Sequence, residues 1–112
     1  LELINKQGVF MEGSNRILIY GRIGQKPELR YTAKREAVCS FSVAENIPDS
    51  EAPKWHKVVV WGRQAELCSA QLDKGSQVFA RGRNVECEFK TKVGENKKYT
   101  ELRADLIGIS MV

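Results

Sequence analysis

Residues 55–76 read W-H-K-V-V-V-W-G-R-Q-A-E-L-C-S-A-Q-L-D-K-G-S, and the change of hydrophobic period inside this stretch decides the fold. Its first part, 55–62, is rich in β-branched and aromatic residues, which predicts a strand. Its second part, 63–74, predicts a helix, because three apolar residues recur at helical spacing: Ala65, Cys68 and Leu72. Gly75 follows where a glycine commonly ends a helix.

Two strand regions are predicted before this stretch. The first runs from Asn15 to Ile23, where Gly21 suggests a bend or a bulge. The second is split into Leu29–Thr32 and Ala37–Asn46, and the segment 47–54, with two prolines and a serine, is predicted to be a surface loop. Alternation in the second region predicts a buried face made of four residues: Ala37, Cys39, Phe41 and Val43.

Two further strands are predicted after the helix. One spans Gln77 to Phe89, a turn follows at Gly94-Glu95-Asn96, and the last strand runs from Lys98 through Leu106 or beyond. The fold class is therefore all-β, and five strands with one helix between strands 3 and 4 is the order of an OB-fold barrel. Another small β-barrel with an inserted helix is the alternative. We expect one domain over residues 15–112, preceded by an N-terminal extension over residues 1–14.

Composition narrows the function without fixing it. The 112 residues include 18 Lys and Arg against 14 Asp and Glu, a formal charge of +4, which permits a phosphate-bearing partner but equally fits a basic soluble domain. The three cysteines are scattered and there is one histidine, so no metal site and no cofactor is expected. No apolar run is long enough for a membrane span.

The strand at 55–62 carries the main functional signal. Because side chains alternate between the two faces of a strand, Trp55, Lys57 and Trp61 share one face with Val59. Aromatic side chains stack on any base, which suits binding of single strands, and Lys57 with the nearby Arg63 can meet phosphates. The alternative is that one tryptophan closes the core while the other caps an apolar patch.

Further candidate contacts lie on the flanking strands. Arg83 and Phe89 are candidates for phosphate and base contacts on a strand whose parity a bulge at Gly82 could shift, and Phe79 is expected in the core. Arg81 shares that parity. Arg16 and Arg22 can extend the positive track, and Tyr31 is ambiguous between surface and core. Four lysines form either a clamp or a solvated edge of the last hairpin: Lys90, Lys92, Lys97 and Lys98.

Two segments resemble the bacterial single-stranded DNA-binding proteins. The first is N-R-I-L-I-Y-G-R-I-G-Q-K-P-E-L-R-Y-T at 15–32, and the second is K-W-H-K-V-V-V-W-G-R-Q-A-E-L-C-S-A-Q-L-D-K-G-S-Q-V-F-A-R-G at 54–82. The combination of W-H-x-V-V with a downstream L-x-K-G-S is specific, and the resemblance covers about residues 15–107. It implies an OB-fold protein that binds and protects single-stranded DNA in replication, recombination and repair, in the cytoplasm at the nucleoid, without catalysis.

The resemblance also assigns roles to residues. It implies that Trp55, Trp61 and Phe89 stack on bases, and it places His56 at a subunit interface of a homotetramer. Basic positions near the DNA path match four residues of this chain: Arg16, Lys57, Arg63 and Lys74. The loop at 47–54 lacks an aromatic residue that some relatives carry, and Glu86 and Glu88 occupy hairpin positions that are often basic. Relatives continue into an acidic tail that recruits replication and repair proteins, and we expect that tail to be absent from this chain.

Two other function classes compete with this reading. One is a protein-interaction module of the same fold, of the primosome accessory type, against which the two tryptophans argue. An RNA-binding version is a close variant of the DNA reading. An enzyme would need a nucleophile with its base, a carboxylate pair or a metal cluster, and the single histidine, His56, has no such partner in the sequence.

Overall fold

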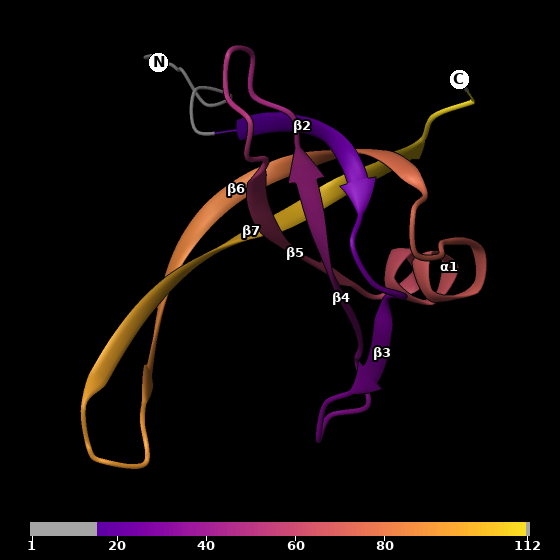
Figure 1. Ribbon diagram of the computed structural model, residues 1–112. Helices are drawn as coiled ribbons and strands as arrows, with labels where there is room; N and C mark the ends of the chain where they lie inside the picture. Colours follow the sequence, from indigo (N-terminus) through magenta and orange to yellow (C-terminus); the bar gives the residue numbers. More distant parts are fainter. Residues whose placement is uncertain (1–15, 112) are drawn as a thin grey trace, which may run out of the picture.

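The computed structural model describes residues 16–111, so the expected extension over residues 1–14 and the strand start at Asn15 lie outside the described residues. The elements in chain order are strands β2 (Arg16–Ile23), β3 (Glu28–Tyr31), β4 (Ala37–Glu45) and β5 (Lys54–Trp61), helix α1 (Arg63–Gln71), and strands β6 (Gln77–Lys90) and β7 (Asn96–Ile109). The helix lies between β5 and β6, as the sequence predicts (Figure 1).

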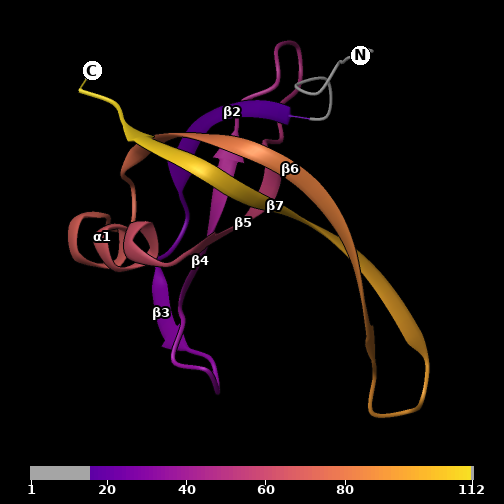
Figure 2. The same cartoon turned by 180° about the vertical axis from the view of Figure 1, so that it is seen from behind.

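The strands pair into a closed ring. Its order is β2-β6-β7-β5-β4, and a second pairing of β2 with β4 completes it, while the short β3 pairs on the outside with β4. All of these pairings are antiparallel except that of β5 with β7, where Lys57–Val59 run alongside Glu101–Arg103. Strands β6 and β7 continue past the ring as a long hairpin, which projects from the body of the molecule in both ribbon views (Figures 1 and 2).

The core lies inside this ring. The four alternating residues of β4, namely Ala37, Cys39, Phe41 and Val43, are all buried, which confirms their predicted face. Helix α1 packs against the core through the residues whose spacing predicted it, because Ala65, Cys68 and Leu72 are each at most 5% exposed. Side-chain burial of this kind supplies most of the stability of a short helix.

One glycine prediction is wrong, and for another only one of its two alternatives, the bulge, is excluded. Helix α1 ends at Gln71, and Gly75 is instead the positive-φ residue of the next turn, with its N–H donating to the carbonyl of Ile23 at 2.8 Å. The pairing of β2 with β6 runs without a register shift through Gly21, so there is no bulge there. Gly21 is needed because a Cβ would lie 2.1 Å from the carbonyl oxygen of Ala44 on β4.

A bulge does occur at the point suggested near Gly82, but its extra residue belongs to β7. Arg81 pairs with Leu106, whereas Gly82 pairs with Ala104, so Asp105 has no partner of its own on β6. An inserted residue reverses the alternation of the strand that carries it. Therefore Arg103 and Leu106, three residues apart, both point away from the core.

Candidate nucleic-acid interface

The outer face of β5 carries the two tryptophans. Trp55 is 57% exposed and Trp61 is 44% exposed, whereas Val58 and Val60, which point the other way, are buried completely. Lys57 lies between the tryptophans on their face and is exposed, and Val59 is covered by its neighbours. The two indole rings are therefore surface features of the ring of strands, and neither closes the core.

The indole of Trp55 is in close contact with the backbone at Gly24. A Cβ built on Gly24 would lie 2.7 Å from Cζ3 and 2.9 Å from Cη2 of Trp55, so the outer edge of the indole lies against the backbone that follows β2. The amide of Gly24 donates to the carbonyl of Ser42 on β4 at 3.0 Å, which fixes that backbone. The backbone thus restricts the edge of the ring, while the 57% exposure of Trp55 leaves ring surface on which a base can stack.

Lys57 connects β5 to the hairpin of β6 and β7. Its ammonium lies 4.9 Å above the ring of Tyr99 on β7, and the Tyr99 ring is 5.7 Å from the ring of Phe89 on β6. A cation over an aromatic face is attracted by the negative charge of the π system. The predicted contacts Lys57 and Phe89 are thereby joined through a third residue, Tyr99.

Tyr99 lies in a polar part of the hairpin. Its pKa is raised, chiefly by the side-chain hydrogen bond with Cys87 and then by partial desolvation and the charge of Glu101. A raised pKa keeps the phenol neutral at physiological pH, so Tyr99 adds an uncharged aromatic ring beside the cations.

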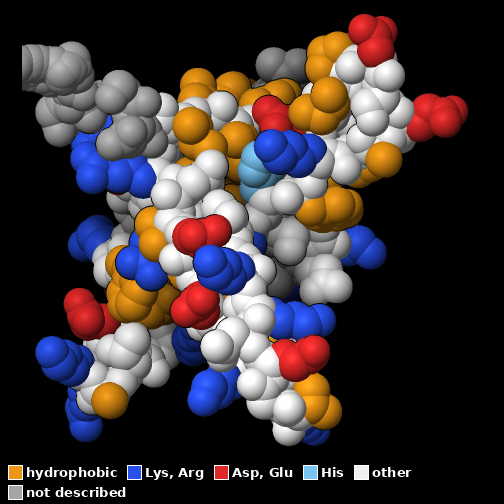
Figure 3. All heavy atoms as spheres, turned by 90° about the vertical axis from the view of Figure 1, so that its left-hand side faces the viewer, with side chains coloured by type: hydrophobic (Ala, Val, Ile, Leu, Met, Phe, Trp, Pro, Cys, Tyr) orange, Lys and Arg blue, Asp and Glu red, His pale blue; other side chains and the backbone are white. Residues whose placement is uncertain are grey.

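Charge on the hairpin is mixed. Phe89 and Lys90 are exposed at its end, but Glu86 and Glu88 are exposed on the same strand. Figure 3, which views the molecule from the side on which the hairpin projects, shows Lys and Arg side chains interspersed with acidic ones over this face. The phosphate track expected from the sequence is therefore not an unbroken basic surface.

A row of arginines crosses the neighbouring strands. Arg16 on β2 lies opposite Arg83 on β6, which lies opposite Arg103 on β7. Arg103 of this row is paired with an acid on its own strand. Its guanidinium is 3.0 Å from the carboxylate of Glu101, a side chain that is 9% exposed. The pKa of Arg103 is raised, mainly by that hydrogen bond, so this arginine stays charged.

Asp105, the bulge residue of β7, binds two of the predicted DNA contacts. Its carboxylate lies 3.4 Å from Nε of Arg16 and 2.9 Å from Nε of Arg81. Its backbone carbonyl accepts a hydrogen bond from the side chain of Gln64 on α1 at 2.8 Å. Arg16 and Arg81 are thus partly neutralised, and the phosphate attraction expected of them is reduced.

The remaining predicted cations lie at the edges of the tryptophan face. Arg63 is the first residue of α1, two positions after Trp61, and it is exposed. Arg22 donates from Nη1 to the carbonyl of Gly75 at 3.1 Å, which places it beside the turn that carries the exposed Lys74. The structure therefore brings Lys57 and Arg63 to the tryptophan strand and groups Arg22 with Lys74 at another corner.

The comparisons with known proteins bear on this geometry. Residues 14–110 match the model of the single-strand binding protein family. This chain belongs to that family. An OB-fold follows from the membership, in agreement with the observed ring of strands and helix position.

Two curated relatives are both named as single-stranded DNA-binding proteins. The chain is 37% identical over 98 residues to the single-stranded DNA-binding protein 1 of Chlorobaculum tepidum, covering 80% of this chain and 60% of the relative. It is 34% identical over 110 residues to the single-stranded DNA-binding protein of Paenarthrobacter nicotinovorans, covering 90% of this chain and 65% of the relative. The chain thus spans less than two thirds of the length of either protein. Membership in a family of non-catalytic binding proteins agrees with the prediction that the chain is not an enzyme.

Within this single-strand binding fold, Phe79 corrects a prediction. It is not a core residue: it is 41% exposed on the outer face of β6, and its ring lies 4.6 Å from that of Tyr20 on β2. Val78 and Ala80 point inward instead and are fully buried, because β6 keeps one phase through Gly82, so that Phe79 shares the outward face of Arg81 and Arg83. Tyr31 is also exposed, and its hydroxyl donates to the carboxylate of Glu66 on α1 at 3.0 Å, which raises the pKa of Tyr31.

His56 is a structural residue in this chain. Its side chain is 10% exposed, and its Nε2 lies 2.8 Å from Oε1 of Glu45 on the adjacent strand β4. Since a carboxylate only accepts, the imidazole nitrogen is the donor. The placement of His56 at a subunit interface stays a prediction.

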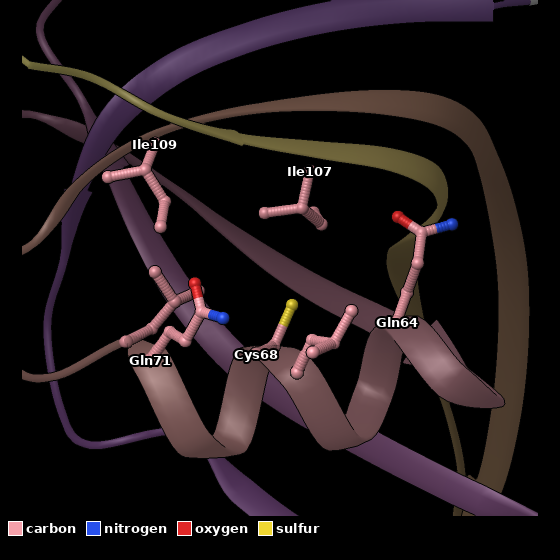
Figure 4. Close-up of a pocket in the computed structure, with 7 residues that line it drawn as sticks. Gln64, Cys68, Gln71, Ile107 and Ile109 are labelled. Carbon is pink, nitrogen blue, oxygen red and sulfur yellow. The ribbon is translucent and has the colours of Figure 1, made fainter.

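A pocket lies between α1 and the end of β7, and neither tryptophan lines it. It has a volume of about 180 Å³, and Figure 4 shows the thiol of Cys68 directed across it toward Ile107. Burial, with the neighbouring Cys39, raises the pKa of Cys68 to about 11, and burial also raises the pKa of Cys39. Both thiols are therefore protonated and unreactive at neutral pH.

Residues 16–111 contain neither a cluster of metal-binding side chains nor a helix suited to span a membrane. Within this range no group of three metal-binding side chains lies close enough together to hold an ion. No helix in the described part of the chain has the length and apolarity needed to cross a membrane.

Sequence reasoning missed three residues of the interface. Tyr99 was visible as an aromatic residue of the last hairpin, but its pairing with Cys87, and hence its place near Phe89, depends on the register of β6 and β7. Arg103 and Asp105 gave no such signal, because their direction depends on the bulge in β7.

Proposed function

We propose that this chain binds single-stranded DNA without regard to sequence, by aromatic stacking and phosphate contacts, and protects it during replication, recombination and repair. The observation that carries the proposal is that two exposed tryptophans, Trp55 and Trp61, share the outer face of β5 with Lys57, which links that face to Tyr99 and Phe89 on the hairpin. Exposed aromatic rings beside cations are the features with which OB-folds hold unpaired strands. The names of both relatives support the same ligand.

The proposal assigns a role to each side chain. The rings of Trp55, Trp61, Phe89 and Tyr99 offer flat π surfaces to bases, each worth about 1–3 kcal/mol. Cations beside those rings attract the phosphates: Lys57, Arg63 and Lys90, with weaker shares from Arg22, Lys74 and Arg83. Arg16 and Arg81 contribute least, because Asp105 already binds them.

A homotetramer is the second part of the proposal. Four apolar side chains are exposed together on β2, β6 and β7, with exposures of 40–63%: Leu18, Tyr20, Phe79 and Leu106. An apolar patch of this kind, rimmed by charge, commonly marks a protein interface. Its rim carries both signs, as Arg16 and Arg81 flank Asp105, so two copies related by a two-fold axis can match cation to anion.

Two finer expectations belong with this proposal. A cytoplasmic location at the nucleoid follows from the proposed ligand, since chromosomal DNA lies there in bacteria. Contacts with replication and repair proteins are expected through an acidic tail of the kind that the family resemblance implies.

The test is a titration of the intrinsic tryptophan fluorescence. The protein is mixed with an oligothymidine at low and at high salt, with a duplex as the control. Strong quenching by the single strand and little by the duplex is the expected result, because Trp55 and Trp61 are exposed. No quenching together with no binding would refute the proposed ligand and leave the interaction-module reading.

A further inference from the structure

The two tryptophans of β5 cannot hold neighbouring bases. Trp55 and Trp61 are six residues apart on one strand, and a strand rises about 3.3 Å per residue, so their positions differ by about 20 Å. Successive bases of a stacked strand are about 3.4 Å apart. At least one base between the two stacked ones must therefore lie over the middle of β4 and β5, where there is no aromatic side chain on the outer face.

A shallow pocket occupies this middle region. It has a volume of about 240 Å³, and its polar lining comes from three strands and the loop before β3: Gln25, Lys26, Glu28, Ser40, Ser42 and Lys57. The register agrees, since Glu28 lies opposite Ser40 on β4, and Ser42 lies opposite Lys57 on β5. The pocket is smaller than the ~300 Å³ at which drug-sized sites begin, so it suits one base at most.

The charges of the pocket favour a base edge over a phosphate. One of its two cations is paired, since Lys26 is 3.5 Å from the carboxylate of Asp73; the other, Lys57, is directed toward the ring of Tyr99 on the hairpin side, where it can meet a phosphate beside the pocket. The carboxylate of Glu28, in contrast, forms no hydrogen bond or ion pair with any residue in the described range 16–111. A free carboxylate repels a phosphate but accepts a hydrogen bond from an amino group.

We propose that this pocket reads the hydrogen-bonding edge of one base, with Glu28 accepting from an exocyclic amino group. Cytosine and adenine carry such a group, whereas thymine presents a carbonyl oxygen at the matching position, which a carboxylate repels. Binding would then be indifferent to sequence along most of the strand and selective at one position. This inference rests on the proposed function, because it requires a single strand on the tryptophan face.

The test compares oligocytidine and oligothymidine deoxynucleotides of equal length on the native chain and on Glu28→Gln. Glutamine keeps the shape of the side chain but offers a donor as well as an acceptor, so it tolerates thymine. We expect the preference for cytosine over thymine to fall at least about fivefold in the variant, at the lower end of what one base contact discriminates. Differences in intrinsic stacking between the two oligomers cancel in this comparison.

Glu36→Gln is the matched control, since it removes the same charge from the turn between β3 and β4, outside the pocket. Equal tightening of both oligomers by the two variants would overturn the proposal, because Glu28 would then act only as a charge. Replacement of the 4-amino group of the cytosine oligomer by hydrogen should weaken its binding to the native chain, and should weaken it less on Glu28→Gln, where the preference is already reduced; an unchanged affinity on the native chain would also overturn the proposal. Failure of the native chain to bind any single strand would instead refute the proposed function.

Discussion

The edge of the indole ring of Trp55 lies against the backbone of Gly24, so closely that a methyl group at Gly24 would be 2.7 Å from Cζ3 and 2.9 Å from Cη2 of the ring. A side chain at this position is opposed by the neighbouring ring and not by the backbone angles of the glycine. A residue with no proposed contact to DNA thereby sets the position of a proposed stacking surface.

Gly24→Ala should therefore weaken single-strand binding while leaving the fold intact. The added methyl group must displace the indole, since contacts below 3.0 Å between such atoms are not tolerated. We expect a loss of about 1 kcal/mol, the lower end of the value of one stacked base. Fluorescence titration measures it, with Gly108→Ala as the control because its Cβ would meet only ordinary contacts at 3.8 Å. Unchanged affinity with an unchanged emission spectrum would show that the ring position does not matter.

Trp55→Ala and Trp61→Ala should each reduce the binding free energy by about 1–3 kcal/mol. Both rings are exposed, so thermal unfolding should change little and the loss should appear in affinity. Leu67→Ala, which removes another exposed apolar side chain from helix α1, serves as the control. If neither tryptophan variant binds more weakly than this control, stacking on β5 is excluded.

The salt dependence of DNA binding should distinguish cations that contact phosphates from cations that are already paired with Asp105. Lys57→Ala should reduce the slope of log affinity against log salt by about 0.7, the value for one phosphate contact on a single strand. Arg16→Ala should change it less, because Asp105 lies 3.4 Å from that guanidinium. Asp105→Asn should steepen the slope, since it releases both Arg16 and Arg81. A slope that is flat in the native chain would contradict the role of all these cations.

Leu18→Lys should lower the mass of the assembly. Leu18 is 63% exposed in the apolar patch on β2, so a cation there costs little in the single chain but is repelled across a two-fold interface. Light scattering at matched concentration measures the mass. Val93→Lys, at an 80% exposed position near the tip of the hairpin, is the control. A native chain that already runs as a monomer would exclude the tetramer, and an unchanged mass in Leu18→Lys would move the interface elsewhere.

The thiol of Cys68 should resist alkylation near pH 8. Its pKa is raised from the ordinary value of 9.0 to about 11, so the reactive thiolate is about 100-fold scarcer than for an ordinary thiol. Reactivity should grow as the pH rises toward 11, because only the thiolate reacts. Cys87 is half-buried and should be modified first. Mass spectrometry after brief iodoacetamide treatment tests this, and equal rates at Cys68 and Cys87 in the folded protein would contradict it.

The fold was predictable wherever a periodic pattern was long enough to show. The spacing of Ala65, Cys68 and Leu72 predicted a helix face that is buried as expected, and the alternation of β4 predicted its inward residues. The parity of Trp55, Lys57 and Trp61 likewise placed them on one exposed face. In each case the signal depends only on residues close together in the chain.

The failures depend on partners distant in the chain. Phe79 was expected in the core because it lies nearer the helix, but the inward phase of β6 is set by Val78 and Ala80, which pack inside the ring. The pairing of Arg16 and Arg81 with Asp105 joins three strands and a bulge, and nothing in the local sequence indicates it. Gly21 and Gly24 were visible as glycines, but the atoms that require them lie on β4 and β5.

The bulge at Asp105 lies between two surfaces that one strand serves. Before it, Tyr99, Glu101 and Arg103 point outward beside Lys57; after it, Leu106 points outward beside the patch of Tyr20 and Phe79. Deletion of Asp105 would make the strand regular without turning either flank, because Arg103 and Leu106 would then be two residues apart and would still share a face. The inserted residue is therefore a carrier of charge: it holds a carboxylate against Arg16 and Arg81 without changing which residues face outward, so its loss would free two cations and leave both surfaces in place.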